Sequence, residues 1–151
     1  MKQNFIFIFI AVITICNSTL NAQVIPEENV PASVIKVFNS KFKKVTDRSW
    51  HKENKTNFEA FFKQNGEAKS AVFSKNGSWV KTTMLIKVSQ LSEPVKFNLN
   101  LTYPKAVYTK VVDEDSYAYL KRYYVDLIFK QKKYTVIFKP NGEIVKSTLI
   151  K

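Results

Sequence analysis

Few side chains in this sequence have the type and spacing that catalysis or metal binding needs. His51 is the only histidine and Cys16 the only cysteine in the 151 residues. A single imidazole without a second histidine or cysteine makes a poor metal site. No serine lies in the sharp, glycine-flanked turn of a hydrolase nucleophile. The sequence therefore predicts no catalytic residues, no cofactor and no metal site, and His51 is interpreted as an ordinary strand residue.

The acidic run Asp113-Glu114-Asp115 is the remaining candidate, as a site for a hard cation. It lacks the glycine and the distant glutamate of a calcium loop, so we expect it to be a solvated hairpin tip. Asp126 stands alone among apolar residues, and one carboxylate does not make an acid–base pair. We therefore expect that the protein is not an enzyme.

The elements that would position a binding site occur twice along the chain. The segment 76–83 (NGSWVKTT) recurs as 141–148 (NGEIVKST). Apolar residues at helical spacing predict a helix over 31–42 and a second one between Ser92 and Pro104. Alternating residues after each helix predict four strands, and the three Asn-Gly pairs predict type I′ hairpin turns.

The sequence therefore predicts an α+β fold of two tandem repeats, each a helix followed by a four-stranded antiparallel sheet. One helix on four strands encloses only a small core. We therefore expect the two units either to pack together or to share a continuous sheet.

The first 22 residues have the layout of a secretory signal peptide. A largely apolar run over 5–15 is followed by the small residue Ala22, and the run is shorter than the roughly 20 apolar residues that span a bilayer. We expect cleavage after Ala22, a leader over 23–29, a first unit over 30–88 and a second over 89–151. This implies a periplasmic or secreted protein with no integral membrane segment after cleavage.

The chain is strongly basic, with 24 Lys+Arg against 12 Asp+Glu and a formal net charge of +12. Such a charge favours acidic partners. The alternative is that the lysines, which are spread along the chain, solvate the outer faces of strands and protect sheet edges. Export argues against nucleic acid as the natural ligand, so an acidic glycan or a lipid headgroup remains among the candidate polyanions.

Strand periodicity assigns side chains to two faces of the sheet. One face is apolar in both units and should cover the helices. The other face should carry aromatic side chains interleaved with lysines, and its candidate partner-binding residues are Phe61, Trp79, Lys81, Tyr108, Tyr124 and Lys146. Exposed aromatics beside basic residues are common binding anchors. The alternative is that this face packs against the other unit, or that the aromatics only reflect strand propensity.

The order of aromatic and glycine positions resembles a known family of exported bacterial proteins. In the first unit these positions are Phe42, Trp50, Phe58-x-Ala60-x-Phe62, Gly66, Ala71-x-Phe73 and Gly77-x-Trp79, and in the second they are Tyr103-Pro104 and Phe138-x-x-x-Gly142. This pattern resembles the PepSY-like family, also named beta-lactamase-inhibitor-like. Lys43 departs from it where a proline is common, and the second unit lacks a glycine near Gln131-Lys132. The resemblance implies a non-catalytic binding module of the cell envelope, and it does not imply inhibition of a beta-lactamase.

The combined prediction is an exported, non-catalytic module that binds an unidentified protein or peptide through the open face of its sheets. Binding of a polyanion, such as an acidic glycan or a lipid headgroup, is one alternative. Inhibition of a secreted hydrolase or peptidase is another.

Overall fold

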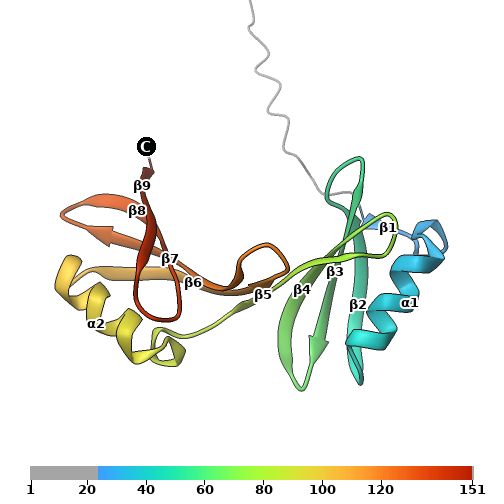
Figure 1. Cartoon of the computed structure of the whole chain (residues 1–151), viewed down its shortest axis with the longest axis horizontal. Coiled ribbons are helices and arrows are strands. Elements are labelled where there is room, and N and C mark those ends of the chain that lie inside the picture. Colours follow the sequence, from blue (N-terminus) through green and yellow to red (C-terminus); the bar gives the residue numbers. More distant parts are fainter. Residues whose placement is uncertain (1–23, 151) are drawn as a thin grey trace, which may run out of the picture.

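The computed structural model describes residues 24–150. The expected signal peptide over 1–22 lies outside the described residues. In chain order the elements are β1 (Val24–Ile25), the 3-10 helix η1 (Glu27–Asn29), α1 (Ala32–Lys41), β2 (Val45–Lys52), β3 (Asn57–Gln64), β4 (Glu67–Ser74), β5 (Trp79–Leu85), the 3-10 helix η2 (Val88–Gln90), α2 (Glu93–Thr102), β6 (Val107–Ser116), β7 (Leu120–Phe129), β8 (Lys132–Phe138) and β9 (Ile144–Ile150). Figure 1 shows them along the long axis of the molecule.

All nine strands form one antiparallel sheet in sequence order, β1 to β9. The prediction of two tandem repeats, each a helix with its own four-stranded sheet, is therefore wrong. β5 pairs with β6 from Lys81 opposite Ser116 to Leu85 opposite Val112, and these strands cross the middle of the molecule in Figure 1. Two separate sheets would each have left a row of unpaired backbone groups at this point, and pairing β5 with β6 removes both rows.

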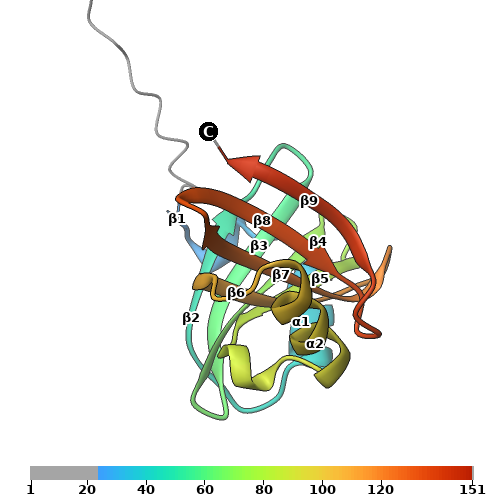
Figure 2. The same cartoon turned by 90° about the vertical axis from the view of Figure 1, so that its left-hand side faces the viewer.

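Each helix covers one end of the sheet and has its own hydrophobic cluster. Val34 and Phe38 of α1 are fully buried among side chains of β2, β3 and β4. Val95 and Leu99 of α2 are equally buried among side chains of β6, β7 and β8. In Figure 1 the helices lie at opposite ends of the long axis, and in Figure 2, along that axis, they overlap.

The strand register places both helices on the same face of the sheet. Ala71 of the first cluster is opposite Thr82, Thr82 is opposite Asp115, and Asp115 is opposite Lys121. Directly opposed residues share a face, and so do residues two positions apart on one strand. Lys121 therefore shares its face with Tyr123 of the second cluster. The opposite face has no helix of residues 24–150 on it, and we name it the open face.

The helix boundaries agree with the sequence prediction to within one or two residues. α1 begins at Ala32, directly after Pro31, and α2 begins at Glu93, after Ser92. The Ser92 side chain makes no capping hydrogen bond to its own helix. Its hydroxyl instead donates to the Pro140 carbonyl at 2.6 Å, which ties the start of α2 to the turn before β9.

Only one of the three Asn-Gly pairs makes the predicted two-residue turn. Asn65 and Gly66 have φ angles of +53° and +81°, as a type I′ hairpin requires. At the other two turns only the glycine has a positive φ. There the side-chain oxygens of Asn76 and Asn141 accept a hydrogen bond from the backbone N–H two residues on, and the loops are longer.

The acidic run 113–115 is not a hairpin tip, contrary to the prediction. It lies inside β6, which continues to Ser116. Directly opposite on β7, Asp115 faces Lys121 and Glu114 faces Arg122. Opposite charges across an antiparallel pair stabilise the ladder, so this hairpin extends further than the acidic composition alone indicates.

Candidate binding face

The open face is built from rows of directly opposed residues that cross the strands. One row runs from Phe61 on β3 through Ser70, Thr83 and Glu114 to Arg122 on β7. A second row, from β5 to β9, consists of Leu85, Val112, Tyr124, Ile137 and Lys146. The rows cross the β5–β6 pairing, so the face extends without interruption over both halves of the sheet.

Two neighbouring hollows lie in the centre of this face. The first, of about 310 Å³, is lined by the apolar side chains of Phe61, Leu85 and Val112 together with Lys110. The second, of about 370 Å³, has a mixed polar lining that includes Lys81, Glu114, Tyr124 and Asp126. Thr83, Lys110 and Val112 line both hollows. An apolar hollow and a more polar hollow therefore lie side by side on the open face.

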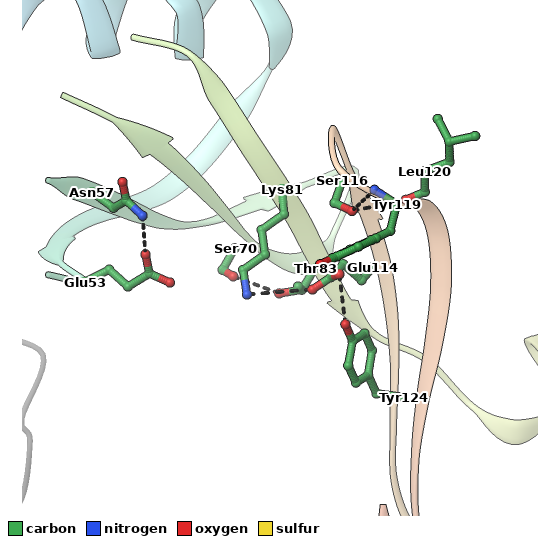
Figure 3. A network of polar contacts seen from close by, with 10 residues as sticks. All are labelled: Glu53, Asn57, Ser70, Lys81, Thr83, Glu114, Ser116, Tyr119, Leu120 and Tyr124. Atoms are coloured by element: carbon green, nitrogen blue, oxygen red, sulfur yellow. Dashed lines mark hydrogen bonds and ion pairs between the residues drawn. The ribbon is translucent and has the colours of Figure 1, made fainter. Parts of the chain in front are cut away.

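A buried carboxylate organises the polar hollow, and Figure 3 shows its polar contacts. Glu114 is only 6% exposed. The Tyr124 hydroxyl donates to its Oε1 at 3.0 Å, and the Lys81 Nζ lies 3.7 Å from its Oε2. Beside it, the Ser70 and Thr83 hydroxyls lie 2.8 Å apart in a hydrogen bond. These contacts satisfy the carboxylate and hold the floor of the hollow in one arrangement.

Burial is the main reason that the pKa of Tyr124 is raised above its usual value, and the Glu114 charge and hydrogen bond raise it further. Tyr124 therefore stays protonated at neutral pH and remains a hydrogen-bond donor. The negative charge of Glu114 is thus shared between this donor and Lys81. The centre of the open face is consequently less basic than the overall charge of the chain indicates.

Four of the six predicted partner-binding residues lie on the open face, namely Phe61, Lys81, Tyr124 and Lys146. Phe61 is 41% exposed, and its ring meets the His51 ring edge-on with centroids 4.8 Å apart. The four are spread over β3, β5, β7 and β9 rather than gathered at one point. Only Phe61, Lys81 and Tyr124 line the two hollows.

The expected orientation of Trp79 is wrong, because its side chain packs on the helix side. It contacts the cluster beneath α1, and the Lys41 Nζ lies 3.9 Å from its ring centroid. The cause is an irregularity in the β4–β5 pairing, where Val72 faces Lys81 but Phe73 faces Trp79. One extra residue in a strand makes the residues on either side of it point to opposite faces of the sheet.

Tyr108 is misplaced by the sequence prediction for the same reason. The β6–β7 register shifts between Tyr108 and Lys110. Tyr108 therefore turns to the helix side and packs against the cluster beneath α2, while Lys110 lines the open-face hollows. Burial raises the pKa of the Tyr108 hydroxyl.

Glu114 and Lys110 are among the residues of the site that the sequence prediction did not include. Glu114 is expected at a solvated tip because the acidic run lacks the glycine and the distant glutamate of a calcium loop. The sequence does contain a signal against that assignment. Lys121-Arg122 follows the acidic run at the spacing of a hairpin that closes near Tyr117 to Tyr119. Lys110 has no comparable signal, since its orientation depends on the bulge.

The described residues hold no metal-binding cluster of the usual kind: over 24–150, no three His, Cys, Asp or Glu side chains lie together at metal-binding distances. Every buried side-chain nitrogen and oxygen in this range has a hydrogen-bond partner. No helix within 24–150 has the length and apolar composition to cross a bilayer.

No protein-family model and no curated protein matches this sequence. Solved structures do share its fold. A BLIP-like protein from Bacteroides fragilis aligns with a TM-score of 0.73 and 17% identity, over 80% of this chain and 86% of that chain. A DUF2874 family protein from Bacteroides uniformis aligns with a TM-score of 0.72 and 19% identity, over 79% of this chain and 88% of that chain.

A protein proposed to be periplasmic, from Bacteroides eggerthii, aligns with a TM-score of 0.72 and 18% identity. The match covers 80% of this chain and 89% of that chain. At these identities the likeness shows the fold alone. It confirms the beta-lactamase-inhibitor-like part of the resemblance, while membership of the PepSY-like family stays a prediction. The chain therefore has a BLIP-like fold.

Proposed function

We propose that this chain is a non-catalytic binding module of the periplasm that recognises a protein or peptide through its open face. The observation that carries the proposal is the pair of adjacent hollows on a sheet face that no helix of the described residues covers. The layout of residues 1–22 and the likeness to a protein proposed to be periplasmic support export. The likeness to a BLIP-like protein supports a protein partner.

The apolar hollow is suited to an aliphatic or aromatic side chain of the partner. Phe61 and Leu85 are 41% and 66% exposed, and both would lose contact with water when the hollow is filled. The edge-on contact with His51 already restrains the Phe61 ring. A restrained aromatic residue loses little entropy on binding, which is a property of interface hot spots.

The charges around the hollows indicate what should flank that apolar anchor. Lys81 is already paired with Glu114, whereas the ion pairs formed within 24–150 do not include Lys110. Lys110 lines both hollows and is exposed. We therefore expect the partner to present a carboxylate to Lys110 beside its apolar anchor.

A long polyanion suits this face less well, despite the basic composition of the chain. The open face carries the carboxylates of Glu59, Glu114 and Asp126 between its lysines. A uniform row of phosphates or sulfates would meet these like charges. A folded protein or a short peptide can instead place acidic and apolar groups separately.

The test is affinity capture from an envelope extract with three matched forms of the exported protein. Phe61→Ala should reduce retention of the partner at least about tenfold, since hot-spot truncations cost about 2 kcal/mol or more. Phe97→Ala is the control, because Phe97 is 67% exposed on α2, away from the open face. Equal retention by the wild type and Phe61→Ala, or equal losses in both variants, would contradict the proposal.

A further inference from the structure

The strand β9 is an open sheet edge. Within residues 24–150 its only neighbour in the order β1 to β9 is β8, through six residue pairs from Lys133 opposite Ile150 to Phe138 opposite Ile144. All seven residues of β9 are exposed. The other edge strand, β1, has only two residues. In the described part of the chain, β9 therefore presents the longer row of backbone N–H and C=O groups with no strand beyond it.

Natural edges are usually protected by proline, by several charges, by bulges or by being short. β9 contains no proline and a single charge, Lys146. Its irregularity lies at the start of the strand, where Phe138 faces Ile144, so the pairing from Lys146 to Ile150 is regular. Apolar and β-branched residues make up most of the strand, as in strands that accept a further neighbour.

The two sides of β9 have different chemistry. Lys146 and Thr148 lie on the open face, opposite Ile137 and Thr135 of β8. Leu149 lies on the helix side, where it is 47% exposed. An added strand would therefore place alternate side chains beside a cation and beside an apolar group.

The charge around this edge selects the kind of added strand. From Leu127 to the end of the chain the sequence has six lysines and one acidic residue, Glu143. Glu143 is paired with Lys139 at 2.8 Å. Within 24–150 neither Lys133 nor Lys146 has a carboxylate at ion-pair distance. The edge is thus cationic and uncompensated.

This charge also disfavours a second copy of the chain at the edge. Two copies joined through β9 would bring their uncompensated lysines together, and the full sequence is strongly basic, with a formal charge of +12. Like charges across a strand pair are destabilising. An acidic segment of another protein would instead place its carboxylates beside Lys146.

We propose that β9 binds an extended acidic peptide segment of a partner protein, which adds to the sheet as a tenth strand. Backbone hydrogen bonds to the outer edge supply the affinity, and Lys146 and Leu149 select acidic and apolar residues at alternating positions. This surface is the edge of the sheet and does not depend on the proposed function of the open face.

The test uses a fluorescent peptide of alternating glutamate and valine, and its Kd is measured by anisotropy with the full exported chain. Two further versions of this peptide are N-methylated on alternate backbone amides. One version is methylated at the odd-numbered positions and the other at the even-numbered positions. In an added strand only one set of amides points toward β9. Methylation of that set should raise the Kd at least tenfold, and methylation of the other set should change it less than twofold.

The charge requirement is tested with Lys146→Glu, which should raise the Kd at least tenfold. Lys36→Glu is the matched control, because it makes the same charge change at an exposed position of α1. Phe61→Ala should leave the Kd unchanged, which separates this surface from the open face.

Equal effects of the two methylation patterns would overturn the proposal, and so would the absence of binding at millimolar peptide. Equal effects of the Lys146 and Lys36 substitutions would show only attraction to net charge. A dimer in sedimentation equilibrium that Leu149→Lys disrupts would show that a second copy occupies the edge.

Discussion

Alanine substitutions at the three Asn-Gly turns should have unequal effects on stability, because the turns have different surroundings. All three glycines have a positive φ, between +81° and +92°. A Cβ at Gly142 would lie 2.7 Å from the Pro94 carbonyl oxygen, and one at Gly77 would lie 2.8 Å from that of Ser33. A Cβ at Gly66 would meet no atom within 4 Å. Two of the turns are therefore packed against the first turn of a helix.

The expected costs follow from these distances. A non-glycine residue in the left-handed region costs about 1–2 kcal/mol, and Gly66→Ala should lose only that. At the two packed turns the added carbon must also displace a helix backbone, and overpacking adds about 1–3 kcal/mol. We therefore expect losses of about 2–5 kcal/mol for Gly77→Ala and Gly142→Ala. At Gly142 the Asn98 side-chain amide also donates to the glycine carbonyl at 2.8 Å, and this contact would be strained.

Urea unfolding measures these losses, with tryptophan fluorescence and far-ultraviolet circular dichroism as two probes. Trp50 and Trp79 both lie beside the α1 cluster, so their fluorescence reports on the first half of the sheet. Because β5 and β6 join the halves, Gly142→Ala should shift both probes to the same lower midpoint. Equal losses at all three glycines would refute the steric argument. A shift in circular dichroism without a shift in fluorescence would refute cooperative unfolding of the sheet.

Three further substitutions test individual contacts. Tyr124→Phe should destabilise the fold by about 1–3 kcal/mol in urea unfolding, since it removes the hydroxyl donor of the buried Glu114 carboxylate. Trp79→Ala should lower the unfolding midpoint more than Phe61→Ala does, because Trp79 packs on the α1 cluster whereas Phe61 is 41% exposed. The reverse order would contradict the conclusion that the irregular β4–β5 pairing turns Trp79 to the helix side. Burial raises the pKa of the Tyr108 hydroxyl above the value of about 10 that it would have in an unfolded chain. The stability that the protonated hydroxyl contributes is therefore fully present below pH 10, and it is lost as the pH rises through the raised pKa. Tyr108→Phe should therefore lose less stability than the wild type between pH 9 and 11 in thermal melts, and parallel pH profiles would contradict this.

Local structure could be predicted from the sequence because its causes are local. Apolar residues at helical spacing placed the first helix over 31–42, against Ala32–Lys41 in the structure. Alternation also predicts four strands after each helix, and the structure has β2 to β5 after α1 and β6 to β9 after α2. The joining of the halves was left open, because the choice between two packed sheets and one continuous sheet depends on pairing between β5 and β6. No local pattern encodes that pairing.

The candidate site was predicted only where the strands are regular. Alternation assigned Phe61 and Tyr124 to the open face correctly, since no bulge separates them from their paired neighbours. It failed for Trp79 and Tyr108, which lie beside register shifts. A bulge depends on how two strands fit together, and so it leaves no reliable mark on the alternation of one strand. Glu114 was missed because its burial depends on Lys81 and Tyr124, which are distant in the sequence.

The same local arrangement follows both of the longer Asn-Gly turns, and it explains where the cations lie. After each turn a register shift directs the first strand residue, Trp79 or Ile144, to the helix side, and the lysine two positions later to the open face. Lys81 lies in the middle of the sheet, where Glu114 is within reach and compensates it. Lys146 lies on the last strand, where β8 has no acidic residue to offer. The two lysines hold equivalent positions but differ in charge environment. The Lys81 charge is balanced by Glu114, which suits the centre of the open face to an apolar anchor. The Lys146 charge is not balanced, which suits the β9 edge to an acidic strand.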